Sequence, residues 1–168
     1  MNALPKKTST RKKRGGRPRV ERIYHVIEFV DWDWDYMFGI EPPGRFSDGD
    51  PYMDYRHLHI RGKLLRPTAI SIKASIAEVT CFPDDRLSDL EGRRKHQPKM
   101  VGVISHRGKD YQVNLHLPDD ALALVLQMMI ANRYRYVVIE AEKSFRGEAL
   151  VRHFRFAGSL DEDDLPKA

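Results

Sequence analysis

Apolar side chains recur at every second position along most of this chain, and this alternation restricts the fold mainly to β structure. In residues 111–117, for example, Tyr111, Val113 and Leu115 share one face with Leu117. A period of two places successive side chains on opposite faces of a strand, so that one face is buried while the other meets water. About seven segments show such a β-type pattern. We therefore predict a mainly β fold of about seven strands.

One segment, residues 119–132, interrupts the alternation. Asp119 and Asp120 precede a run of Ala, Leu and Met, which are strong helix formers, and Asn132 is a plausible end. The segment is apolar nearly all round, so we expect a buried helix clamped between other elements. Five strands, the helix and two further strands predict a small antiparallel β-sandwich or partly open barrel; a two-layer α+β arrangement is the alternative. Glycines predict tight turns at 107–110 and 144–148.

Charge is distributed very unevenly along the 168 residues. Residues 1–22 contain nine basic residues and one acid, a net charge of +8, whereas residues 23–158 are neutral. The last ten residues carry a net charge of −3. We therefore expect a disordered basic arm over 1–22, a single β-rich domain over 23–158 and an acidic flexible tail over 159–168. The arm alone makes the whole sequence basic.

The arm contains the most informative motif, a Gly-Arg-Pro-Arg segment within basic flanks. It resembles an AT-hook, whose core is Arg-Gly-Arg-Pro, although Gly15 stands where that motif has its first arginine. The resemblance implies that an extended backbone enters the minor groove of A·T-rich DNA and that flanking cations neutralise phosphates. The predicted nucleic-acid contacts are Lys12, Lys13, Arg14, Arg17 and Arg19.

A second unusual segment, residues 31–36, alternates aspartate with aromatic residues. On a strand, the face opposite the aspartates consists of Trp32, Trp34 and Tyr36. A strand with its aromatics in the core is the simplest interpretation. The aromatic face is alternatively a stacking surface for a sugar or a base, or a face that docks a partner. Hard-cation binding is a further hypothesis, and its candidate ligands are Asp31, Asp33, His57 and His59.

Motifs of established enzyme classes are absent from the sequence. It contains no HExxH, no P-loop and no Gly-x-Ser-x-Gly, so we expect neither catalysis nor a cofactor. Cys81 is the only cysteine, which excludes an internal disulfide and favours a cytoplasmic setting. The longest apolar run is too short to span a membrane.

The leading hypothesis is a non-enzymatic, DNA-associated protein. The alternatives are a protein-docking adaptor, and a small-molecule or carbohydrate binder that uses Trp32 and Trp34.

Overall fold

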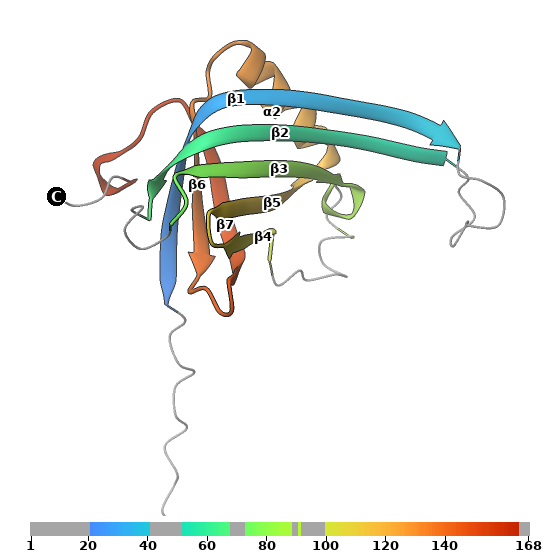
Figure 1. Cartoon of the computed structure of the whole chain (residues 1–168). Coiled ribbons are helices and arrows are strands. Elements are labelled where there is room, and N and C mark those ends of the chain that lie inside the picture. Colours follow the sequence, from blue (N-terminus) through green and yellow to red (C-terminus); the bar gives the residue numbers. More distant parts are fainter. Residues whose placement is uncertain (1–20, 41–51, 68–72, 89–90, 92–99, 165–168) are drawn as a thin grey trace, which may run out of the picture.

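The computed structural model describes residues 21–40, 52–67, 73–88, 91 and 100–164. These residues form seven strands and one short α-helix (Figure 1). The strands are β1 (Arg22–Ile40), β2 (Tyr52–Arg66), β3 (Ile76–Asp84), β4 (Gly102–Arg107), β5 (Asp110–Pro118), β6 (Tyr136–Glu142) and β7 (Glu148–Ala157). Helix α2 is Asp119–Ile130, and two 3-10 turns, η1 and η2, are Asp85–Leu87 and Glu162–Asp164. The predicted order of five strands, helix and two strands is confirmed.

The seven strands pair into one mixed sheet that closes in a ring, in the order β1-β2-β3-β5-β4-β7-β6. Six of the pairings are antiparallel, whereas β3 and β5 are parallel, so the expectation of a wholly antiparallel sheet was wrong. The reason is that β4 and β5 form a hairpin in which β5, and not β4, lies beside β3. The ring is not a regular barrel, because β1 bends through two irregularities in its register and continues beyond the sheet (Figure 1).

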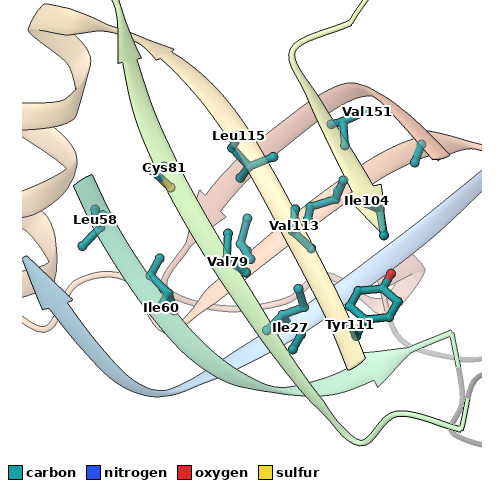
Figure 2. Packing of buried hydrophobic residues seen from close by; sticks show 14 of the residues in the cluster. Ile27, Leu58, Ile60, Val79, Cys81, Ile104, Tyr111, Val113, Leu115 and Val151 are labelled. Atoms are coloured by element: carbon teal, nitrogen blue, oxygen red, sulfur yellow. The ribbon is translucent and has the colours of Figure 1, made fainter. Parts of the chain in front are cut away.

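The core fills the inside of this ring with the apolar faces that the alternation predicts. Figure 2 shows side chains from β1, β2, β3, β4, β5 and β7 pointing toward one another. Tyr111, Val113 and Leu115 are buried on β5, and the polar residues between them are exposed. Cys81 lies in the same core, where burial raises the pKa of its thiol to about 12. The period-two pattern therefore determines which side of each strand faces inward.

Helix α2 covers one end of the ring with a single face. Only Leu122, Val125 and Met129 are buried on it, while the side chain of Leu124 is 62% exposed. The expectation of a helix buried on all sides was wrong, because α2 packs with one face against the ends of β3 and β5 rather than between two layers. A salt bridge of 2.9 Å from Arg56 to the first residue of the helix, Asp119, attaches α2 to β2.

Among the described residues, no helix is long and apolar enough to cross a bilayer.

Beyond that end, β1 and β2 continue as a ribbon of two strands. Strand β6 pairs with β1 only as far as Glu28, and β3 pairs with β2 only between Leu58 and Lys63. Large apolar side chains on this extension are exposed to solvent: Tyr36, Met37, Phe38, Ile40, Tyr52 and Tyr55. Two-stranded ribbons are only marginally stable alone in water, so the ribbon relies on the ring for its position.

The acidic C-terminal segment, expected to be flexible over 159–168, is attached to the ring as far as residue 164. The Asp164 side chain forms an ion pair with Arg155 and also accepts a hydrogen bond of 2.9 Å from the backbone N–H of Asp161. Arg66 donates to the backbone oxygens of Asp163 and Asp164. Asp164 is only 8% exposed, and the Arg155 guanidinium and the Asp161 N–H satisfy its carboxylate in this buried position.

Candidate nucleic-acid interface

The end of the ring opposite α2 is built from two adjacent hairpin turns, residues 107–110 and 143–148, which we call the turn end. The backbone N–H of His106 donates to the oxygen of Gly147 at 2.8 Å, which joins the two hairpins. The basic arm meets the ring at the same place, since the N–H and ammonium of Lys143 each bond to Glu21 at 3.0 Å. The topology therefore brings Glu21, near the end of the arm, to the same end of the ring as both turns.

Local sequence explains both turns, which were predicted. Gly108 adopts a φ of +63° in the first turn, a conformation that costs glycine little. In the second turn Arg146 and Gly147 adopt φ values of +55° and +87°, as a two-residue hairpin loop of type I′ requires. A side chain at Gly147 would place its Cβ 2.7 Å from the backbone oxygen of His106, so the turn can accept only glycine there. Because the two hairpins approach each other closely at Gly147 and His106, the positions of their tips relative to each other are fixed.

Cationic and aromatic side chains gather at these tips. Phe145 is 72% exposed, and the guanidinium carbon of Arg146 lies 5.0 Å from the centre of its ring. Arg107, Lys109 and Arg146 form no ion pair with any other described residue. Such a combination of an exposed ring with uncompensated cations is typical of surfaces that contact nucleic acid.

A hollow of about 300 Å³ opens between the two turns. It is lined by Ser105, His106, Arg107, Asp110, Gln112, Arg146, Gly147 and Glu148. The lining thus offers both hydrogen-bond donors, from the guanidinium groups and the amide, and acceptors, from the two carboxylates. A planar polar ligand with a mixed donor and acceptor edge matches this lining better than a bare anion, which the carboxylates would repel.

Two hydrogen-bonded pairs lie directly behind the turns. The hydroxyl of Tyr111 is 2.5 Å from Nδ1 of His25, and Nε2 of His106 is 3.0 Å from the Ser144 hydroxyl. Figure 2 shows Tyr111 at the end of the core remote from α2. Burial lowers the pKa of His25 to about 4, and the neighbouring His106 adds to this lowering. Burial also raises the pKa of the Tyr111 phenol, so both groups are neutral at pH 7.

The arm residues predicted to contact DNA, Lys12, Lys13, Arg14, Arg17 and Arg19, lie outside the described residues. The structure therefore shows where their segment joins the ring and nothing about their contacts.

The aspartate-tryptophan segment lies on β1 with its two faces separated as predicted. Trp32 and Trp34 are partly buried against the core, whereas Tyr36 on the same face is 60% exposed because it lies on the ribbon. The three side chains thus do not form one open stacking surface. Part of each tryptophan ring is covered by the core, which supports the interpretation of residues 31–34 as a core strand.

The four candidate metal ligands share the outer face of β1 and β2, where Asp33 stands opposite His59 in the register. The carboxylates of Asp31 and Asp33 accept hydrogen bonds of 2.9 and 2.8 Å from the N–H of the following tryptophan. His59 lies 3.5 Å from Asp35, and Thr80 lies 3.3 Å from its other ring nitrogen. Across the described part of the chain, no three histidine, cysteine or acidic side chains are grouped to hold one metal ion.

A shallower hollow of about 220 Å³ also opens on this outer face, between β1, β2 and β3. It is lined by Asp31, Trp32, Asp33, His59, Ile60, Arg61, Glu78, Val79 and Thr80. Its charged side chains come from three strands and alternate in sign, which is typical of a solvated sheet face.

Sequence reasoning did not identify the residues of the turn end. Arg107 and Lys109 were recognised only as parts of a turn, and Phe145 and Arg146 were likewise placed in the second turn without a role. An exposed Phe-Arg pair at the tip of a predicted hairpin was the available signal.

No protein-family model, curated protein or solved structure matches this chain.

Proposed function

We propose that this protein is a non-enzymatic, nucleic-acid-associated protein whose basic arm contacts DNA. Arg17 and Arg19 enter the minor groove or bridge phosphates, and Lys12, Lys13 and Arg14 neutralise further phosphates. The observation that carries the proposal is the separation of charge. Residues 1–20 carry eight basic residues and no acid, whereas the described residues together carry twenty acidic and fifteen basic residues, a net charge of −5.

The structure adds support through the point where the arm joins the ring. Lys143 forms an ion pair with Glu21 at the turn end, whereas Arg107, Lys109 and Arg146 of that end have no ion-pair partner among the described residues. A nucleic acid held by the arm is therefore brought to an end of the domain that offers further positive charge, from Arg107, Lys109 and Arg146. Counterion release from the phosphates supplies the affinity.

The test compares two triple substitutions in the full chain that remove the same charge. The arm variant replaces Arg14, Arg17 and Arg19 with Gln; the control replaces Lys73, Arg133 and Arg135, which are exposed elsewhere on the domain. Binding to a labelled duplex is measured by anisotropy between 50 and 200 mM salt. We expect the arm variant to reduce the slope of log affinity against log salt by about 2 to 3, and the control to leave it unchanged. Equal losses in both variants would refute a specific role for the arm.

Base composition separates groove insertion from simple phosphate binding. If Arg17 enters the narrow minor groove, an A·T-rich duplex binds more tightly than a G·C-rich duplex of the same length, and the preference disappears in the arm variant. Equal affinity for the two duplexes would restrict the arm to phosphate contacts.

The ribbon favours protein docking as a second candidate function. Its six exposed apolar side chains belong to a segment with one unpaired edge on each strand, and such edges can add a strand from another chain. If copies of this chain dock in this way, sedimentation velocity shows a concentration-dependent dimer that Phe38→Ser and Ile40→Ser abolish. A monomer at every concentration would remove this form of the candidate.

A further inference from the structure

We propose that the turn end binds an unpaired nucleobase of a single-stranded nucleic acid, with Phe145 as the stacking surface. The inference rests on the proposed function and deepens it. The arm supplies affinity for any polyanion, and the turn end makes the protein distinguish single strands from duplexes. Bases inside a duplex are stacked on each other, so only an unpaired base can reach a protein aromatic ring.

The position of Phe145 supports a stacking role. Its backbone is held by two hydrogen bonds with Glu148, of 2.7 and 3.1 Å, at the base of the tight turn. The ring is thus presented to solvent on a fixed backbone, although a phenylalanine is normally buried. The Arg146 guanidinium lies over the ring, and the side chain of Phe145 is still 72% exposed, so it keeps surface on which a base can stack.

The backbone of Arg146 is an independent indication. Its φ of +55° is unusual for a residue that is neither glycine, asparagine nor aspartate, and such positions are enriched at functional sites. The preferred sequence for this turn is Asn-Gly, which would be more stable in isolation. An arginine in this strained position places its guanidinium over the Phe145 ring, and the same residue lines the hollow.

The hollow explains how a base would be recognised rather than only stacked. Asp110 and Glu148 provide acceptors, and the guanidinium groups of Arg107 and Arg146 provide donors. Carboxylates accept hydrogen bonds from the exocyclic amino group of cytosine, which thymine lacks. The phosphates then lie at the turn tips, near Lys109, away from the carboxylates.

The experiment uses the full chain and three labelled probes: a (dC)12 single strand, a (dT)12 single strand and a 12-base-pair duplex. Phe145→Ala should weaken (dC)12 binding about tenfold or more, because stacking on one aromatic ring is lost, and should change duplex binding less than twofold. Phe145→Tyr retains a ring and should stay within about twofold of the wild type. Leu124→Ala, which removes another exposed apolar side chain on α2 at the opposite end of the ring, is the control and should have no effect.

Several outcomes would overturn the inference. It fails if Phe145→Ala binds (dC)12 as tightly as the wild type, or if duplex binding falls equally. If the arm variant loses binding to the probes while Phe145→Ala does not, the proposed role of the turn end is wrong and the arm proposal stands. If the wild type binds none of the probes at 50 mM salt, both proposals fall. If the wild type binds (dC)12 more tightly than (dT)12 and Glu148→Gln removes this preference, the result supports base recognition in the hollow.

Discussion

Acid should destabilise this protein through one buried histidine. His25 is only 5% exposed, its Nδ1 is bonded to Tyr111, and its Nε2 has no described partner. Its pKa falls from an ordinary 6.5 to about 4 in the folded state, mainly because burial disfavours the imidazolium. Between these two values the unfolded chain binds a proton that the folded chain does not. Stability is therefore complete above pH 6.5 and decreases as the pH falls toward 4.

The size of the effect follows from the two pKa values. A difference of about 2.5 units corresponds to about 3 kcal/mol once the pH is below both values, and to about 2 kcal/mol at pH 5. Asp84 does not interfere in this window. Its pKa is lowered from 3.8, mainly by its hydrogen bond to Arg86, so its contribution to stability is lost only at lower pH.

The assay is urea unfolding at pH 7.5, 6.5, 5.5 and 5.0, followed by the fluorescence of Trp32 and Trp34. The comparison is a double variant, His25→Phe with Tyr111→Phe, because removing the histidine alone would leave a buried hydroxyl unpaired. We expect the wild type to lose about 2 kcal/mol more than the double variant between pH 7.5 and 5.0. Equal pH dependence of the two proteins, or a His25 resonance that titrates near 6.5 by NMR, would refute the reasoning.

Three further outcomes follow from the packing. Gly62→Ala should destabilise the fold by about 1 to 3 kcal/mol in urea, because the new Cβ would lie 2.3 Å from a side-chain carbon and 2.6 Å from a backbone oxygen of β1. Gly39→Ala, whose nearest neighbour is 3.7 Å away, is the control and should change stability by less than about 0.5 kcal/mol. Arg155→Gln should also lower stability, by about 1 to 3 kcal/mol, since it leaves the buried Asp164 carboxylate without its cation; unchanged urea curves would show that the attached C-terminal segment contributes nothing. Cys81 should react with a thiol reagent only after unfolding, because its pKa of about 12 and its burial keep it protonated and inaccessible; fast labelling of the native protein would contradict the described core.

The sequence by itself predicts the local features of this protein. Strand faces follow from the two-residue period, because adjacent side chains of an extended backbone point in opposite directions. Both hairpin turns at the turn end follow from Gly108 and Gly147, which supply the positive φ that tight loops need. The start of α2 follows from residue types close together in the chain. The charge of the arm is likewise a property of consecutive residues.

Only the tertiary structure decides which distant segments meet. The parallel pairing of β3 with β5, the single buried face of α2 and the contact between His25 and Tyr111, 86 residues apart, depend on how the ring closes. No local pattern encodes them, because strand edges can pair with many partners and the choice depends on the packing of the whole core. The same closure places Phe145, Arg146, Arg107 and the beginning of β1 at one end of the ring. The candidate interface therefore exists only in the folded chain, although each of its turns is visible in the sequence.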